Sequence, residues 1–316
     1  KMAEAKSSKK RTYEEVLALA KARGNPGLVE LPAAIMQTLP PAPLAQLPLW
    51  PEAVRGVPNS VLRSALFGAI QRGRRAFQLR MKKASIDGVT IIHTGPTLDQ
   101  ADLDVWEQSL HLARVGGLGT RIQFSAGSFL KAIDRSSGGK DIEWLKGAFA
   151  RLASSVVEIQ DGKRAYFGPM LHNGARDDET GHYAIEMNPA IVALYGGDGW
   201  SSVQFAERRA LKKQPLAQWL HGFYSTHARP FAFKVATLHQ LCGSENGQLA
   251  GYRRDLNDAL TKLSGATGWT CEIDENDLVQ IAKTPTSSQR RHLLKSAKNN
   301  GIAHMPPAKV VHKITG

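Results

Sequence analysis

Between residues 99 and 283, the pattern of hydrophobic positions predicts the same order of secondary-structure elements in two successive copies. In the first copy, apolar residues recur at the spacing of an amphipathic helix, β-branched runs follow, and Asp161-Gly162 separates two such runs as a hairpin turn. The predicted elements are a helix at 99–115, a strand at 121–124, helices at 127–133 and 141–155, and a hairpin of 156–160 and 164–171. This is the element order of a winged helix, in which the hairpin is the wing.

The second copy has a repeat offset of about 110 residues, which is the size of a domain rather than of a solenoid unit. Its predicted elements are a helix at 216–225, a strand at 231–233, helices at 235–242 and 248–264, and a hairpin of 269–273 and 278–283. We therefore predict an α+β fold with two tandem winged-helix domains.

The segments that flank the two copies predict the domain boundaries. Prolines recur between residues 25 and 58 and predict an extended tether after a short helix at 13–21. A strand at 182–187 and a helix at 189–195 complete the first domain, and the glycine-rich residues 196–199 are expected to join it to the second. The predicted division is 1–57 as the N-terminal helix and proline-rich linker, 58–196 as the first winged helix, 197–283 as the second, and 284–316 as a disordered basic tail.

The net charge of +13 favours a polyanionic partner, with nucleic acid first. An anionic membrane surface fits the charge equally well, but we find no basic amphipathic helix with an aromatic face and no apolar run of membrane-spanning length. The two cysteines, Cys242 and Cys271, exclude a disulfide framework and are too few for a zinc finger. The charged N-terminal residues do not resemble a signal peptide, so we expect a cytoplasmic location.

The sequence carries no enzyme motif that we recognise. Gly139-Lys140 has Asp134 where a phosphate-binding loop needs its first glycine, and Asp141 where it needs Ser or Thr. The H-E-x-x-H and G-x-S-x-G motifs and spaced Cys/His clusters are absent from the sequence. We therefore expect no catalytic residue, no metal and no cofactor.

The candidate DNA-binding residues lie on and around the long third helix of each copy. This helix enters the major groove in a winged helix, where Arg suits guanine and Asn or Gln suits adenine, while the wing reaches the backbone. The candidates are Lys140, Lys146 and Arg151 in the first domain, Gln248, Arg253, Arg254, Asn257 and Lys262 in the second, and Lys131, Arg135, Lys163, Arg164, Lys212 and Lys213 as phosphate contacts. The alternative is a solvated basic surface, because Asp255 and Asp258 share the second helix.

A dense apolar segment, Gln46-Leu47-Pro48-Leu49-Trp50, lies within the predicted tether. A short peptide with a polar anchor and apolar plugs can fill a pocket on a partner protein. It resembles the Q-L-x-L-F peptide by which bacterial proteins bind the replicative sliding clamp, with Gln46, Leu47, Leu49 and Trp50 as the contacts. Pro48 and Trp50 depart from the usual residues of that peptide. The alternative is that the segment packs back on the first domain.

Several motifs together resemble the TrfA family of plasmid replication initiators over roughly residues 46–283. They are Val57-Pro58-Asn59-Ser60 through Phe67, Thr94-Gly95 to Leu98, Val105-Trp106, Phe223 through His227, and Leu241 through Ser244. The resemblance implies a bacterial protein whose tandem winged helices bind repeated origin sequences, called iterons, and help to open an adjacent AT-rich element. It also implies recruitment of the host initiator, replicative helicase and sliding clamp, and a monomer-dimer equilibrium in which monomers bind the iterons. Single-stranded DNA of the AT-rich element is a further candidate ligand.

Two other functions are open to the same sequence. A transcriptional repressor would use the same DNA-binding face but has no need of a clamp-binding peptide. A rolling-circle nickase needs a tyrosine nucleophile and a His-hydrophobic-His metal pair, and His111 is followed by Leu112 and Ala113 instead. The mechanism that we expect places helices 141–155 and 248–264 in successive major-groove faces of one iteron, with the second helix supplying most base contacts.

Overall fold

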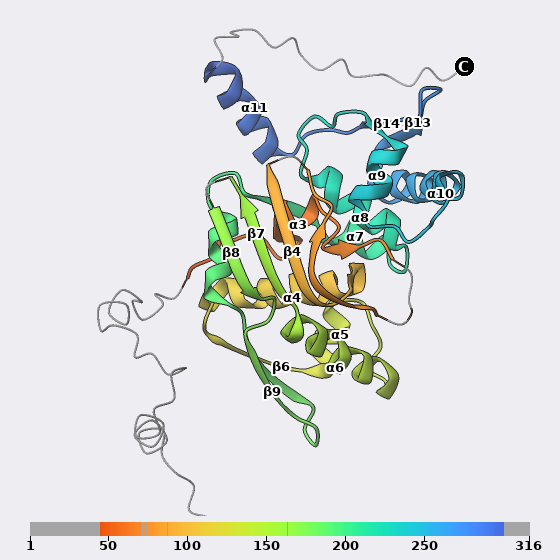
Figure 1. The fold of residues 1–316 in the computed structure, drawn as a ribbon. Coiled ribbons are helices and arrows are strands. Elements are labelled where there is room, and N and C mark those ends of the chain that lie inside the picture. The colour runs from red at the N-terminus through yellow and green to blue at the C-terminus, as the bar shows by residue number, and fades with distance from the viewer. Residues whose placement is uncertain (1–44, 71–72, 74, 87, 163, 300–316) are drawn as a thin grey trace, which may run out of the picture. The chain divides into compact units, whose positions relative to one another are not determined.

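The computed structural model describes residues 45–70, 73, 75–86, 88–162 and 164–299 (Figure 1). The predicted helix at 13–21, the tether before residue 45, Lys163 and the tail beyond residue 299 lie outside the described residues. Within the described ranges the chain is an α+β protein with two winged-helix domains, as the hydrophobic pattern predicts.

The helices of the first domain follow the predicted order. They are α4 (Gln100–Gly116), α5 (Ala126–Ala132) and α6 (Gly139–Ser154), with β6 (Arg121–Ser125) between the first two. Helix α4 begins in a capping box, in which Asp99 accepts hydrogen bonds from the Ala101 and Asp102 backbone N–H groups and the Asp102 side chain accepts one from the Asp99 N–H. Trp106 and Leu110 on this helix are fully buried.

The wing of the first domain is not the hairpin that the sequence pattern indicates. The wing consists of β9 (Asn173–Asp177) and β10 (His182–Glu186), which form the antiparallel sheet β6-β10-β9. The 3-10 helix η1 (Pro189–Tyr195) follows it. The predicted strand at 182–187 is therefore confirmed as β10, and the structure makes it part of the wing, which the sequence did not predict.

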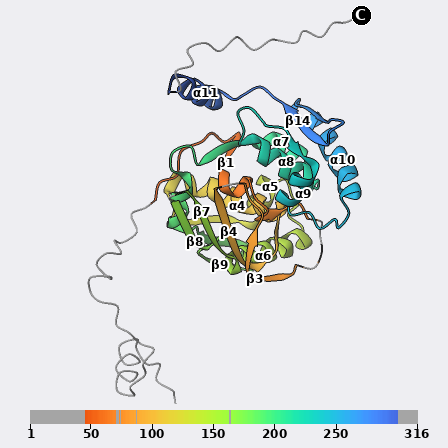
Figure 2. The ribbon, with the colours of Figure 1, turned by 45° about the horizontal axis from the view of Figure 1, so that its top comes forward.

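The hairpin after α6 belongs to a different sheet. Strands β7 (Val156–Asp161) and β8 (Arg164–Pro169) join β3 (Phe77–Lys83) and β4 (Val89–Pro96) in the antiparallel order β3-β4-β7-β8 (Figure 1, Figure 2). Ile91 pairs with Ile159, and both side chains are buried. The assignment of 156–171 as the wing is therefore wrong, because its inward apolar residues need β4 as a partner to complete the core.

The second domain has the predicted order throughout. Its elements are α8 (Pro215–Ser225), β12 (Phe233–Lys234), α9 (Val235–Leu241), α10 (Leu249–Thr267), β13 (Thr270–Ile273) and β14 (Leu278–Ala282). Here the wing directly follows the third helix, and the sheet order is β12-β14-β13. Tyr252, Leu256 and Leu263 of α10 are buried in the core of this domain.

The first domain extends past the glycines that were expected to form the joint. Strand β11 (Trp200–Gln204) follows them and pairs antiparallel with β1 (Val54–Pro58). Helix α3 (Asn59–Leu62) and the parallel pair β2 (Phe67–Gly68) and β5 (Leu98–Asp99) precede α4. The core of the first domain includes Val203 and that of the second begins at Leu211, so the expected boundary after residue 196 and the assignment of 45–57 as linker are wrong.

The basic segment after the second wing contains a helix, α11 (Ser287–Asn299). Thr286 and Gln289 form its start, since Gln289 Oε1 accepts a hydrogen bond from the Thr286 N–H and Thr286 Oγ1 accepts one from the Gln289 N–H. Gln289 Nε2 also donates to the Ser225 carbonyl (2.8 Å). The expectation of disorder from residue 284 is therefore wrong for residues 287–299, and the T-x-x-Q capping signal accounts for the helix.

Arg208 joins the two domains through a buried ionic contact. It lies on α7 (Phe205–Ala210), between the two cores, and is 1% exposed. Its Nε donates to Asp104 Oδ1 (2.7 Å) and lies 3.3 Å from Glu107 Oε2, and its terminal NH2 donates to the Gln100 carbonyl (3.0 Å). Asp104, Glu107 and Gln100 all belong to α4, so one guanidinium links α4 of the first domain to the entry of the second domain.

Glu107 beside Arg208 should make stability depend on pH. Burial raises the pKa of Glu107 to about 7, because neither carboxylate oxygen accepts a hydrogen bond from the described residues and the nearby guanidinium is shared with Asp104. The favourable contribution of this group is therefore complete below its ordinary pKa of 4.5 and is lost as the pH rises through 7.

We expect Glu107→Gln, which cannot titrate, to gain up to about 3 kcal/mol of unfolding free energy relative to the unmodified protein between pH 4.5 and 7. Urea unfolding at a series of pH values measures the difference. A difference that stays constant over this range would contradict the raised pKa.

Candidate nucleic-acid interface

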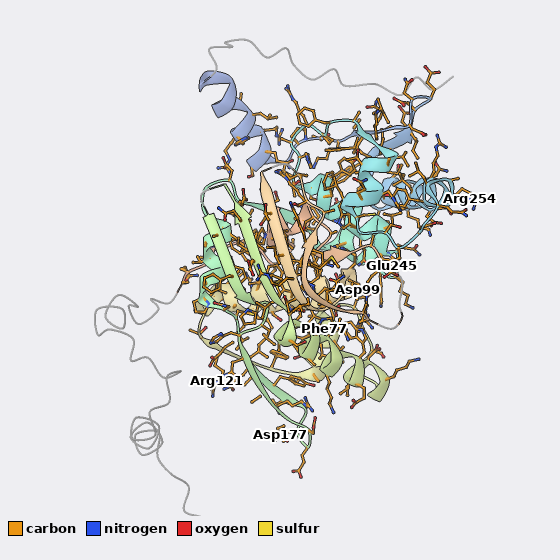
Figure 3. All side chains as sticks on the ribbon, in the orientation of Figure 1. Phe77, Asp99, Arg121, Asp177, Glu245 and Arg254 are labelled. Carbon is orange, nitrogen blue, oxygen red and sulfur yellow. The ribbon has the colours of Figure 1, made fainter. Side chains whose placement is uncertain are left out.

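The third helix of the second domain, α10, presents the clearest candidate surface. Arg254 and Asn257 are exposed and stand three residues apart, so they share one face of the helix. The side chain of Arg254 makes no ion pair or hydrogen bond within the described part of the chain, and Figure 3 shows it pointing outward at the surface of α10. This pair can meet the edges of two neighbouring bases without breaking any contact inside the protein.

Among the other α10 candidates, Arg253 and Lys262 already form hydrogen bonds within the protein, whereas Gln248 does not cap the helix. Gln248 is the exposed N-cap residue of the helix and its side chain caps nothing. Arg253 Nε donates to Asp277 Oδ1 in the wing turn (2.7 Å). Lys262 Nζ donates to Gln214 Oε1 (2.7 Å), which places it against the start of α8. Asp255, the acidic neighbour, accepts a hydrogen bond from Asn246 Nδ2 (3.1 Å).

The first-domain candidates differ in whether the side chain is exposed or already paired within the protein. Lys140 is exposed at the start of α6. Lys146 is paired with Glu143 (2.9 Å) and with Asp178 in the wing (3.0 Å). Arg151 donates from Nε and from a terminal nitrogen to the carboxylate of Asp102, which is buried. Arg151 thus holds α6 against α4, and its removal would leave an unpaired buried charge.

The candidate phosphate contacts form two groups. Lys131 is exposed, whereas the Arg135 guanidinium lies 3.3 Å from the ring centre of Trp144 and pairs with Asp141. Lys212 pairs with Asp134 (3.0 Å), as Arg209 does (3.1 Å), so both serve the contact between α7 and the end of α5. Lys213 beside them is exposed and adopts a φ of 66°. Lys131 and Lys213 are therefore the two members of this set that the described structure leaves available.

Lys163 and Arg164 lose their predicted place in the wing. Arg164 begins β8, and Lys163 lies outside the described residues. Because this hairpin belongs to the four-stranded sheet, the expectation that it reaches the flanking phosphates as a wing is not supported by the fold. The turn of the actual first wing, at residues 178–181, carries Asp178 and Glu179 where we expected Lys163 and Arg164. The turn of the second wing, at residues 274–277, is acidic as well.

The segment Gln46–Trp50 packs on the first domain. Leu47 and Trp50 are 1% and 4% exposed, and both belong to the core of that domain. Trp50 Nε1 donates to His111 Nδ1 (3.1 Å), and Gln46 Nε2 donates to the Arg114 carbonyl (2.7 Å). Leu49 alone is largely exposed, at 75%. The expectation of a free peptide on a flexible tether is therefore wrong for this segment, and three of its four proposed clamp contacts are engaged within the domain.

Two sets of residues could not be found from the sequence pattern. The first is the acidic turn of the first wing, which became visible only once the strand pairing identified that wing. The second is the basic helix α11, where Arg290 and Arg291 are exposed. Elsewhere in the described ranges, no group of three or more His, Cys, Asp or Glu residues is arranged to bind a metal ion. None of the described helices combines the length and apolar character that crossing a membrane requires.

Comparison with known proteins identifies the family. A family model described as TrfA protein matches residues 37–283. A plasmid replication initiator protein TrfA from Escherichia coli is 26% identical over 226 residues, which cover 69% of this chain and 58% of that protein. The chain thus spans less than two thirds of the length of this curated relative. None of these descriptions names an enzymatic activity.

A solved structure with a TM-score above 0.5 shares the fold. Domains 2 and 3 of RctB match with a TM-score of 0.51 at 13% identity, covering 74% of this chain and 99% of that one. The Pi initiator protein in complex with iteron DNA has a TM-score of 0.43 at 11% identity, covering 63% of this chain and 99% of that one. Since the family model matches well over half of the sequence, the chain belongs to the TrfA family.

Proposed function

We propose that this protein initiates plasmid replication by binding iteron repeats in double-stranded origin DNA. The observation that carries the proposal is the exposed Arg254 and Asn257 on the third helix of a winged-helix domain, in a chain of the TrfA family. The net charge of +13 supports it, because neutralising backbone phosphates supplies most of the sequence-independent affinity for DNA.

In this mechanism α6 and α10 enter successive major-groove faces of one iteron. The second domain supplies most of the base contacts, because Arg254 suits the guanine O6 and N7 atoms and Asn257 suits the adenine N6 and N7 atoms. Lys140, Lys131 and Lys213 contact phosphates, which position the protein without reading sequence. Distortion of the bound DNA then favours opening of an adjacent AT-rich element, whose steps deform at low cost.

Replacing Arg254 with alanine should cost about 1 to 3 kcal/mol of binding free energy on repeat DNA and much less on scrambled DNA. Fluorescence titration with both duplexes measures the two losses. Lys213→Ala is the matched control for a phosphate contact, and it should weaken binding to both duplexes alike. If Arg254→Ala also weakened both alike, Arg254 would be a phosphate contact and would not read a base.

The partners that the family resemblance implies belong to the same proposal. They are the host initiator, the replicative helicase and the sliding clamp, in a bacterial cytoplasm, with a monomer-dimer equilibrium and single-stranded DNA of the opened element. Clamp binding by Gln46, Leu47, Leu49 and Trp50 would require the segment to leave the first-domain core.

The alternative function is that of a transcriptional repressor, which would bind the same DNA. Because the Gln46–Trp50 segment packs on the first domain, it no longer separates the two functions, and the distinction needs a replication assay. A plasmid that carries the origin and depends on this protein in trans should be maintained if the protein is an initiator. It should be lost if the protein only represses.

A further inference from the structure

The turns of both wings are acidic. At the first wing, Asp177 ends β9, the turn carries Asp178 and Glu179, and Figure 3 shows Asp177 at the far end of the hairpin. The second carries Asp274, Glu275 and Asp277, and the carboxylate-bearing residues other than Asp274 are exposed. A wing normally approaches the DNA backbone, where a carboxylate meets phosphate of the same sign. The acidic residues therefore oppose the binding that the rest of the chain favours.

In the first domain, one of these carboxylates forms the turn and another holds a cation of the third helix. Asp177 Oδ1 accepts hydrogen bonds from the Glu179 N–H (2.9 Å) and the Thr180 N–H (3.3 Å). Asp178 is not needed for the turn. It pairs with Lys146 of α6 (3.0 Å) and with Arg176 of the wing itself (3.0 Å). Lys146 also pairs with Glu143 of its own helix (2.9 Å), so Asp178 is the wing's share of its neutralisation.

The second domain divides the two tasks in the same way. Asp274 Oδ1 accepts hydrogen bonds from the Asn276 and Leu278 N–H groups, each at 2.9 Å, and so forms the turn. Asp277 pairs with Arg253 of α10 at 2.7 Å. The wings have different sequences and follow their third helices at different distances in the chain. Despite these differences, each domain pairs a cation of its third helix with a carboxylate of its wing turn.

Both pairs are open to solvent on their carboxylate side, so another anion can displace the carboxylate. The side chains of Arg253 and Asp277 are 48% and 55% exposed, and those of Lys146 and Asp178 are 23% and 59% exposed. An ion pair in solvent is weak and is replaced easily by another anion. Random DNA offers only phosphates to these cations, so a phosphate and the wing carboxylate bind each cation with similar strength. A cognate repeat adds base contacts, which hold the helix in the groove while its cation changes partner.

We propose that Asp178 and Asp277 are specificity-determining residues that mask Lys146 and Arg253 from random DNA. The masked cations contact the backbone only when base contacts hold the third helices in the groove. The carboxylates thus lower the affinity for random DNA more than the affinity for the repeats. This inference rests on the proposed function, since it assumes that the third helices read repeat DNA.

The test compares the full chain with its Asp178→Asn/Asp277→Asn variant on repeat and scrambled duplexes over a range of salt concentrations. Asparagine keeps the side-chain shape, and Asp177 and Asp274 keep both turns. The variant should bind scrambled DNA about tenfold more tightly, with a salt dependence steeper by about 0.9 for each additional phosphate that the unmasked cations neutralise. Its affinity for the repeats should rise less, so the ratio of the two affinities should fall.

Two controls assign the effect to the masked cations. Glu158→Gln breaks another exposed pair, with Arg80 at 2.5 Å on the four-stranded sheet, and should change neither affinity. Adding Lys146→Gln and Arg253→Gln to the asparagine variant should return scrambled-DNA binding to its original level or below.

Unchanged binding to scrambled DNA would overturn the inference. So would a loss of repeat binding, because the carboxylates would then be orienting the two cations for recognition. The unmodified protein is titrated first, and absence of any preference for repeats there would count against the proposed function itself, whatever the variants do.

Discussion

Replacing Arg208 with alanine should lower the free energy of unfolding by about 3 to 5 kcal/mol. The guanidinium is almost fully buried and pairs with Asp104 and Glu107 of α4. Alanine would leave two carboxylates without their counter-charge at the contact between the domains, and it would remove a donor from the Gln100 carbonyl. A loss of this size is a large part of the stability of a typical domain. Chemical denaturation followed by circular dichroism measures it.

Arg209→Ala is the matched control, because it is the next residue of the same helix. Its side chain is 46% exposed and pairs with the exposed Asp134, so we expect a loss of no more than about 1 kcal/mol. Equal small losses for both variants would show that the buried pair contributes nothing to the stability of the two-domain unit.

Replacing Trp50 with alanine should cost about 3 to 5 kcal/mol of unfolding free energy. The indole stacks on Tyr195 with ring centres 6.0 Å apart and lies against Gly56, where an added Cβ would stand 2.5 Å from the ring. It also donates a hydrogen bond to His111. The ring thus fills a space in the first domain that alanine would leave as a cavity. Thermal and urea unfolding measure the loss.

Leu49→Ala lies in the same segment and is the control. Leu49 is 75% exposed, so its loss should change stability by about 0.5 kcal/mol or less. If Trp50→Ala were as mild as Leu49→Ala, the segment would not be part of the folded core and the tether interpretation would stand.

Local periodicity predicts much of the fold because the helices of both domains bury a continuous apolar stripe. Leu256, Ala259 and Leu263 on α10 repeat at helical spacing and are all buried. The first wing was misassigned for a non-local reason. The hairpin of β7 and β8 has the composition of a wing, but its partner β4 lies before α4 in the chain, and no local signal links Ile91 to Ile159. Pairing between distant strands thus decides which hairpin becomes the wing.

The segment before residue 58 shows a second limit of local patterns. Its proline density is typical of a tether. Yet Leu47, Trp50 and Val57 are core residues, and β1 completes a sheet with β11 from the far end of the domain. Proline excludes regular helix from this segment, but it does not prevent burial of the apolar residues between the prolines.

The candidate DNA-binding residues could be predicted as a group but not one by one. Residue type and helix face identify Arg254, Asn257 and Lys140, which the structure leaves exposed. The same criteria select Arg151 and Arg253 equally well. Only tertiary structure shows that Arg151 holds the buried Asp102 and that Arg253 meets a wing carboxylate. The partner of a surface cation depends on which loop folds next to it.

The central claim is that the two third helices of this TrfA-family chain read repeated origin DNA. A binding titration of the full chain against a duplex with the plasmid's repeats, and against a scrambled duplex of equal length, tests it most directly at about 150 mM salt, where nonspecific contacts are weak. We predict a preference of about 1,000-fold or more for the repeats. Equal, weak binding to both duplexes would contradict the claim and would leave the positive charge as a general attraction for polyanions.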